Sequence, residues 1–410
     1  MTTAEHRSAN ALYYPRFVKH VAALAAHGFA AQIMVVAVSW QVYEITSDPW
    51  DLGLIGLSQF LPALMLVLVT GLVADRFNRR LVLGLCLGLE LVAALGFVWF
   101  TVTKQTDVNY VFGILALLGT ARAFFNPASD ALSPNLLSRE AIPHGISLNS
   151  MNWQITTITG PVLGGLLFGL GGHVAYGVAA ALLVLAIACV AHIGHVAQDN
   201  HVEETTIGTL LAGVKFIKSE PIVMGAISLD LFAVLLGGAM ALMPIYAKDI
   251  LQVDEVGLGL LRSAIGVGAL LMALWLSKFG IKNHAGKLMF ICVAGFGLFT
   301  VVFGFSTWLP LSLFALVLMG ALDMVSVYIR ETLMQLWTPD AVRGRVNAVN
   351  RVFIGASNEL GEFRAGSVAA LLGAKTAVVI GGAGTIAVAG LWSWMFPALR
   401  QAKRLEGRGR

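Results

Sequence analysis

The stretch "GLVADRFNRR", residues 71–80, is a short basic segment between two long apolar runs. "LSQFLPALMLVLVT" precedes it and "LVLGLCLGLELVAALGFVWF" follows it. A run of about 20 apolar residues is long enough to cross a bilayer as a helix, and a helix satisfies its backbone hydrogen bonds without water. We therefore interpret residues 71–80 as a tight polar loop between two membrane-spanning helices.

The whole chain has the composition of a membrane protein. Of its 410 residues, 57% are hydrophobic and only 12% are charged, and the mean hydropathy is +0.79. A soluble domain has about 25% charged residues. The short alternating segments of a membrane-spanning sheet are not visible in the sequence. The predicted fold class is an all-α, multi-pass membrane protein.

Twelve apolar segments are long enough to span the membrane. They cover residues 18–43, 52–74, 81–102, 108–131, 143–170, 174–193, 222–247, 256–278, 286–305, 308–334, 346–372 and 376–397. One set of alternate loops holds only Lys104, Lys248 and Lys375, whereas the other set, which includes both termini, holds most of the Lys and Arg residues. Because basic loops stay in the cytoplasm, both termini are predicted to be cytoplasmic. The pI of about 9.0 then needs no nucleic-acid partner.

The two halves of the chain repeat each other. Residues of the first half recur in the second at an offset of about 200, namely Gly119, Asp130 and Ala141 as Gly320, Glu331 and Ala341. Such a long period indicates two six-helix halves, predicted at 1–193 and 222–410. Residues 194–221 form a polar cytoplasmic linker in which apolar residues recur at helical spacing. They predict a short amphipathic helix on the inner membrane surface, with an ordinary linker as the alternative.

The loop "GLVADRFNRR" resembles the signature loop of the major facilitator superfamily, with Asn78 in place of a glycine. The resemblance implies a twelve-helix fold that transports a solute by alternating access. It also implies that Asp75 faces a helix N-terminus, where an anion is favoured, and that Arg79 pairs with Asp130. Together with Arg76 and the repeat-equivalent Glu331, these residues would latch the halves in the outward-open state.

A second motif, "GPVLGG", lies in the fifth predicted span. It resembles a Gly-Pro-x-x-Gly motif of proton-coupled exporters in the same superfamily. Small residues let helices approach closely and a proline bends a helix, so helix packing is the expected role of its residues. These are Gly160, Pro161, Gly164 and Gly165.

Longer stretches, including "AFFNPASDALSPNLLSREAIPHGISLNS" and "SNELGEFRAG", resemble the enterobactin-exporter-like and macrolide-efflux-like drug:proton antiporters. The resemblance covers about residues 15–400. One departure concerns span four, where many drug antiporters carry an Arg before a Gly. Here Leu115 and Ala116 precede Gly119, and Arg122 follows it. A direct copy of their coupling scheme is therefore not implied.

Charged residues inside the spans are the candidates for function. A charge at the bilayer centre costs about 2.5–3.5 kcal/mol, so it must face protein or water. The first half has few of them, His27, Glu90, Arg122 and Asp130. The second half has more, namely Asp230, Arg262, Asp323, Arg330, Glu331, Arg351, Glu359, Glu362 and Arg364. Alternatively, these charges form salt bridges with a purely structural role. Such a structural need would be expected in both halves, whereas the charges are concentrated in the second half.

Helical geometry divides the charges of span eleven. At 100° per residue, Arg351, Asn358 and Glu362 fall on one stripe, with Glu359 at its edge. Arg364 points in another direction and is expected to contact a different helix or to extend outward to the membrane interface. With Asp230, Asp323, Arg330, Arg122 and Gln32, the stripe forms the predicted proton-coupling or substrate cavity. Glu359, Glu362 or Asp230 is the hypothesised proton carrier.

For Glu90 and His27, a structural role is favoured. The cysteines Cys86, Cys189 and Cys292 all lie inside apolar runs, which predicts neither disulfides nor a metal site.

The leading functional hypothesis is proton-coupled export of a small organic compound, a drug or a siderophore-like molecule, across a bacterial cytoplasmic membrane. No enzyme motif and no cofactor are expected, because the proton gradient supplies the energy. The expected partners are a small-molecule substrate and the lipid bilayer, with the protein acting as a monomer. The alternatives are an uptake or facilitative carrier of a metabolite, and a transporter-like lipid-handling or sensor protein.

Overall fold

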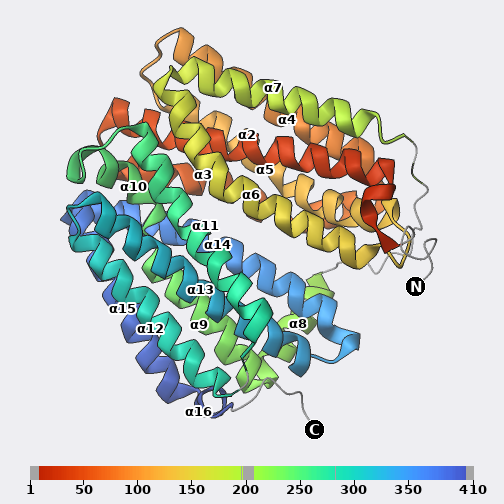
Figure 1. Ribbon diagram of the computed structural model, residues 1–410, viewed down its shortest axis with the longest axis vertical. Coiled ribbons are helices and arrows are strands. Elements are labelled where there is room, and N and C mark those ends of the chain that lie inside the picture. The colour runs from red at the N-terminus through yellow and green to blue at the C-terminus, as the bar shows by residue number, and fades with distance from the viewer. Residues whose placement is uncertain (1–8, 195, 197–206, 282, 403–410) are drawn as a thin grey trace. The chain divides into compact units, whose positions relative to one another are not determined.

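The computed structural model describes residues 9–194, 196, 207–281 and 283–402. Every element of secondary structure in these ranges is helical (Figure 1). The two chain ends, which are predicted to be cytoplasmic, and most of the first part of the linker lie outside the described residues. Because all elements are helices, the predicted all-α fold class is confirmed.

Eleven of the twelve predicted spans each coincide with one helix. The first six are α2 (Pro15–Thr46), α3 (Pro49–Arg76), α4 (Arg79–Val102), α5 (Asn109–Leu132), α6 (Ile142–Gly169) and α7 (Gly172–Ala191). The helix α8 (Ile207–Ser219) follows. The last five are α11 (Glu255–Phe279), α12 (Ala285–Phe305), α13 (Leu309–Trp337), α14 (Asp340–Leu372) and α15 (Ala374–Met395), and a short α16 (Pro397–Arg400) ends the series.

The seventh predicted span is broken. The helix α9 (Pro221–Gly237) ends at a pair of glycines, and the chain resumes in short turns, η3 (Met240–Leu242), α10 (Met243–Ile245) and the π-helical η4 (Tyr246–Ile250). Nine of the described segments are long and apolar enough to cross a membrane. The charged α14 is not among them, because its apolar windows are interrupted by the stripe of charges.

The chain divides into two compact units. Unit 1 comprises Met1–Thr46, Ser58–Thr205 and Asp254–Gly259, and unit 2 comprises Ser47–Leu57, Thr206–Val253 and Leu260–Arg410. The start of α3 thus belongs to unit 2, and the start of α11 belongs to unit 1.

Helices pack in the same pattern within each unit. In unit 1, α2 packs against α6 and α7, and α4 packs against α5 and α7. In unit 2, α9 packs against α14 and α15, and α12 packs against α13 and α15. When the membrane spans of each unit are numbered from the first, α2 or α9, the first span packs against the fifth and sixth in both units. The third span packs against the fourth and sixth in both units. The packing therefore agrees with the repeat seen in the sequence.

Two glycines of the repeat also make the same contact. A Cβ atom on Gly119 of α5 would overlap the main-chain carbonyl of Gln59 on α3. A Cβ atom on Gly320 of α13 would overlap the carbonyl of Ile265 on α11 in the same way. Both positions need glycine because two helix backbones meet there.

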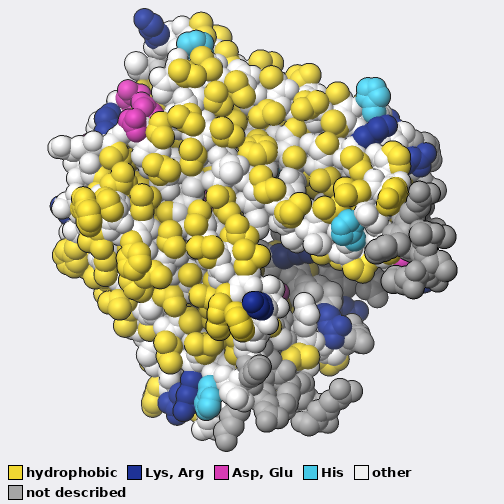
Figure 2. All heavy atoms as spheres, in the orientation of Figure 1, with side chains coloured by type: hydrophobic (Ala, Val, Ile, Leu, Met, Phe, Trp, Pro, Cys, Tyr) yellow, Lys and Arg dark blue, Asp and Glu magenta, His cyan; other side chains and the backbone are white. Residues whose placement is uncertain are grey.

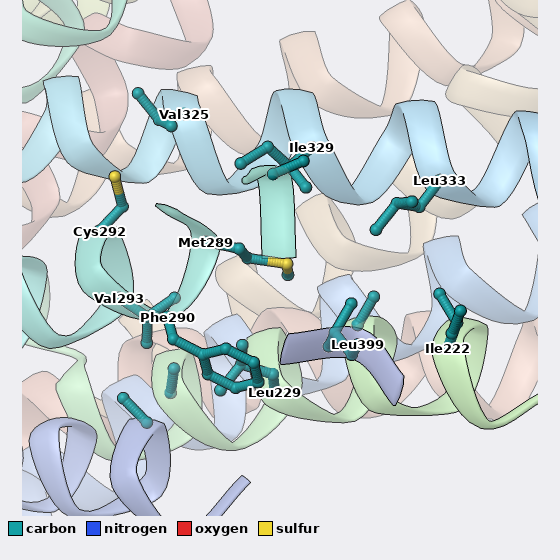
Figure 3. Packing of buried hydrophobic residues seen from close by; sticks show 14 of the residues in the cluster. Ile222, Leu229, Met289, Phe290, Cys292, Val293, Val325, Ile329, Leu333 and Leu399 are labelled. Carbon is teal, nitrogen blue, oxygen red and sulfur yellow. The ribbon is translucent and has the colours of Figure 1, made fainter. Parts of the chain in front are cut away.

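The core of unit 2 lies between α9, α12 and α13 (Figure 3). Ile329 on α13 faces Met289 on α12, and Leu229 on α9 lies beneath Phe290. The outer surface is also apolar, because hydrophobic side chains cover most of the face seen in Figure 2. Leu85, for example, is 70% exposed. An apolar surface around an apolar core is what a lipid solvent requires.

Candidate functional site

A buried ion pair joins two helices of unit 2. Arg330 on α13 binds the carboxylate of Asp230 on α9 through its Nη1 atom. Asp230 is 8% exposed and Arg330 is 4% exposed. Taking two charges out of water costs several kcal/mol each, about as much as their attraction returns. This pair is therefore costly as a staple between helices, which makes it a candidate for function.

Asp323 lies near this ion pair and lines two cavities. It precedes Arg330 by about two turns of α13. Its charge interacts with the charges of both Asp230 and Arg330. Asp323, Val234 and Phe296 line a small cavity that also holds Asp230, and they line a second, larger one. Two carboxylates next to these cavities thus share one guanidinium group.

The larger cavity brings two predicted residues of α14 together. Asn358 and Glu362 both line it, as the predicted stripe requires. Glu362 is close enough to Arg262 on α11 for their charges to interact. The unwound backbone at Gly238 and Ala239 forms another part of the wall. The cavity is therefore lined by carboxylates, an amide and main-chain groups among apolar side chains.

The rest of the stripe lies outside this lining. Glu359 faces the start of α3, since a Cβ atom on Gly56 would lie 2.7 Å from the Oε2 atom of Glu359 and 3.5 Å from that of Glu362. The two carboxylates therefore lie near one glycine. Arg351 is exposed on unit 2 and is not among the residues that line the cavity.

Arg364 holds the end of the broken helix. Its Nε atom donates to the carbonyl of Leu235 at 2.9 Å, and its Nη2 atom donates to the carbonyl of Leu236 at 2.5 Å. These carbonyls belong to the last turn of α9, which has no further turn to satisfy them. The sequence correctly separates Arg364 from the stripe, because it contacts another helix. The charge caps a helix end.

In unit 1, two of the predicted cavity residues have defined neighbours. Arg122 on α5 donates to the Oε1 atom of Gln59 on α3 at 2.8 Å. Gln32 on α2 packs against Gly160 on α6, whose missing side chain leaves room for it. Both side chains are partly buried.

The glycine motif of α6 lies at helix contacts. Gly164 meets the backbone of Ile33 on α2, and Gly165 meets the main chain at Glu255, in the part of α11 that belongs to unit 1. Pro161 lies inside α6 without ending it. The motif thus lets α6 approach two neighbours.

The predicted latch residues lie at helix ends. Arg79 donates to the carbonyl of Ala131 at 3.3 Å, next to Asp130 at the end of α5. Arg76 is exposed at the end of α3, and the side chain of Asp75 lies outside what the structure describes. Glu331 accepts a hydrogen bond from Asn350 at 3.3 Å and lies 3.7 Å from Arg330.

Sequence reasoning missed three features of the site. The break after Gly237 was not predicted, although the pair Gly237–Gly238 followed by Pro244 is a signal for it. Gln59, the partner of Arg122, is polar but uncharged and was overlooked. The third is the neighbour of Arg262, a buried residue whose charge interacts with that of Glu362. Its partner lies on a helix distant in sequence, so no local pattern could reveal it.

Comparisons with known proteins show the family of the chain. The family model described as transmembrane secretion effector matches residues 17–406. The chain is 28% identical over 353 residues to the enterobactin exporter EntS of Shigella boydii serotype 18, covering 84% of this chain and 81% of that protein. It is 27% identical to EntS of Escherichia coli O81 over the same shares.

Solved structures share the fold at low sequence identity. The nucleoside transporter NupG superimposes with a TM-score of 0.74 at 14% identity, covering 93% of this chain and 99% of NupG. A bacterial homologue of the lysosomal transporter Spinster gives a TM-score of 0.75 at 12% identity, with coverages of 95% and 99%. Fold, composition and family model agree: the chain is a transporter of the major facilitator superfamily and belongs to the transmembrane secretion effector family.

Proposed function

We propose that this transporter exports a small organic compound, siderophore-like or drug-like, in exchange for protons. The observation that carries the proposal is the sharing of Arg330 by two carboxylates, Asp230 and Asp323, beside two cavities of unit 2. Glu331 also lies 3.7 Å from Arg330, but its side chain is 41% exposed and water screens its charge. The buried group of Arg330, Asp230 and Asp323, with all three charged, has one negative charge in excess. A single proton neutralises it, and a buried site favours neutrality.

Proton binding would then change the pairing within the site. In the deprotonated site, Asp230 and Asp323 compete for one guanidinium. A proton on one carboxyl leaves Arg330 to the other, so the preferred arrangement of α9 and α13 depends on the proton. In a transporter that works by alternating access, a proton bound from one side and released on the other is coupled to the rocking of its halves.

Further acids could serve the same cycle. Glu362 lines the larger cavity, its charge interacts with that of Arg262, and Glu359 lies near it. The substrate would bind where the cavity presents Asn358 and Glu362. Arg351, Gln32 and Arg122 are proposed to face the substrate path at other stages.

The proposed setting is a bacterial cytoplasmic membrane, as the exporter relatives suggest, with both termini in the cytoplasm and a functional monomer. Two six-helix halves, 1–193 and 222–410, would move about the linker 194–221. Asp75, Arg76, Arg79, Asp130 and Glu331 would latch them in one state.

Transport by proteoliposomes tests the proposal. An inside-acid pH gradient should drive uptake of labelled enterobactin, the compound named for the exporter relatives, with a macrolide as the second probe. The carboxylates are replaced one at a time as Asp230→Asn, Asp323→Asn, Glu359→Gln and Glu362→Gln. Glu140→Gln, on an exposed loop, is the matched control.

Gradient-driven uptake should fall at least tenfold in Asp230→Asn or Asp323→Asn while exchange at equal pH persists. Uptake that persists when a protonophore removes the gradient would overturn proton coupling and favour a facilitative carrier. Full gradient-driven transport by all four variants would exclude these acids as the coupling site.

A further inference from the structure

A further buried acid–base pair lies in unit 1. The Nε2 atom of His27 on α2 lies 3.1 Å from the Oε1 atom and 3.0 Å from the Oε2 atom of Glu90 on α4. The Glu90 side chain is fully buried, and that of His27 is 14% exposed. A carboxylate is rarely buried in this way unless it is paired.

The pair is enclosed on several sides. The ring of Phe125 on α5 stacks on the imidazole at 4.0 Å between centroids. Arg122, one turn earlier on α5, interacts with the charge of Glu90 and is hydrogen-bonded to Gln59 on α3. Cys86, one turn before Glu90 on α4, is the other titratable group near the carboxylate. Side chains from four helices therefore meet at one point.

The hydrogen bonding of the carboxylate is incomplete. Both oxygens approach the same ring nitrogen, which carries at most one proton. The Oε2 atom of Glu90 is buried and has no hydrogen-bond donor of its own. A pair that served only to hold α2 and α4 together would be expected to satisfy both oxygens. An acceptor left open next to a titratable ring is suited to bind a proton.

The repeat gives a second, independent argument. Arg122 follows Gly119 by three residues, and Asp323 follows the equivalent Gly320 by three residues. His27 lies on the first helix of its set, α2, as Asp230 lies on the first helix of its set, α9. Unit 1 thus carries basic groups where unit 2 carries acids. Only Glu90 brings a carboxylate to the cluster of unit 1.

We propose that His27 and Glu90 form a second proton-binding site, which takes up one proton and releases it during the transport cycle. This inference rests on the proposed function. In the deprotonated form, the neutral imidazole donates from Nε2 to the carboxylate. The added proton comes from water and is held by the pair. On release it returns to water, so no other reactant is needed.

The charge of the cluster changes with that proton. With Arg122 charged and the imidazole neutral, the cluster of Arg122, His27 and Glu90 has no net charge. After protonation it carries one positive charge, which burial disfavours. The protonated form should therefore be stable only when water reaches it, as it would once the substrate has left. This gives the pair a means to link proton uptake to substrate release.

Proton binding can be measured directly on the full-length protein. The protein labelled with ¹⁵N-histidine is reconstituted in lipid nanodiscs, and solid-state NMR spectra are recorded between pH 5 and 9. The variant His27→Gln assigns the His27 signals, and His173→Gln, at the start of α7, serves as the matched control. We expect the ring nitrogen signals of His27 to change between pH 5 and 9 in the wild-type protein, and Glu90→Gln to displace this change by at least one pH unit.

Two results would overturn the inference. One is a His27 spectrum that stays constant from pH 5 to 9. This result needs only the wild-type protein and the variant His27→Gln that assigns the signals. The other is gradient-driven transport by folded Glu90→Gln with an unchanged pH profile. The proposed function fails separately, when the wild-type protein itself shows no gradient-driven transport of either probe, whatever the His27 spectra show.

Discussion

Arg330 on α13 is paired with Asp230 on α9, and both side chains are buried inside unit 2. The arginine has a second buried acid, Asp323, within its electrostatic reach, and the more exposed Glu331 lies 3.7 Å from it. One cation between two anions is a poor structural staple, because whichever acid is left over must be neutralised by a proton or by water. The same arrangement is a good proton site, since the number of protons decides which acid is paired.

Removing the cation should be more harmful than removing the whole pair. Arg330→Leu leaves Asp230 as a buried charge without its partner, and we expect a loss of about 3–5 kcal/mol in stability. Adding Asp230→Asn should restore most of it. Thermal unfolding in detergent, followed by tryptophan fluorescence, measures both. Arg139→Gln, on an exposed loop, should change stability by no more than about 0.5 kcal/mol. A double variant less stable than Arg330→Leu would contradict the prediction.

Arg364 should stabilise the broken α9 through its two hydrogen bonds to carbonyls. Arg364→Met removes both donors and leaves two carbonyls unsatisfied, at a cost of about 1–3 kcal/mol. Arg364→Lys should recover part of the loss, because an ammonium group cannot reproduce the planar fork. Thermal unfolding again gives the ranking. Lys375→Met, at an exposed position on α15, is the control, and equal stability of all three variants would exclude the capping role.

The fold could be predicted well from the sequence, because a chain that crosses lipid must form long apolar helices. Each span needs a long apolar run, so twelve helices could be located from composition alone. The repeat followed from glycines such as Gly119 and Gly320, which must stay small where backbones meet. The break in α9 was missed, because Gly237 and Gly238 are equally suited to close packing and to ending a helix.

The site was only partly predictable for a related reason. Rotation about one helix axis can be computed from sequence, and it correctly separated Arg364 from Asn358 and Glu362. Pairing between helices depends on how each is turned toward its neighbour. The bond of Arg330 to Asp230 and that of Arg122 to Gln59 join residues far apart in the chain. No local pattern specifies such contacts.

The charge bias of the loops predicts which ends of the helices face the cytoplasm. In a background without Cys86, Cys189 and Cys292, the variants Thr106→Cys and Arg139→Cys place one thiol in each class of loop. A membrane-impermeant maleimide applied to spheroplasts should label Thr106→Cys at once. It should label Arg139→Cys only after the membrane is permeabilised. The opposite pattern would invert the topology and place both termini outside.

The repeated glycine contacts predict equal sensitivity at two distant positions. A methyl group at Gly119 would overlap the carbonyl of Gln59, and one at Gly320 would overlap that of Ile265. Each helix pair must move apart to admit it, so Gly119→Ala and Gly320→Ala should each cost about 1–3 kcal/mol. The variant at Gly119 should also disturb the hydrogen bond from Arg122 to Gln59, and with it the pH profile of transport.

Gly113, on the same helix as Gly119, provides the matched control, because no atom lies within 4 Å of a Cβ atom placed there. Gly113→Ala should be neutral, or stabilising by up to about 1 kcal/mol, since alanine favours the helix. The unfolding temperatures of Gly113→Ala, Gly119→Ala and Gly320→Ala, measured in one detergent, test this prediction. If Gly119→Ala were as stable as Gly113→Ala, the contact between α3 and α5 would not be close. If only Gly320→Ala were harmful, the two contacts would differ in tightness despite their equivalence in the repeat.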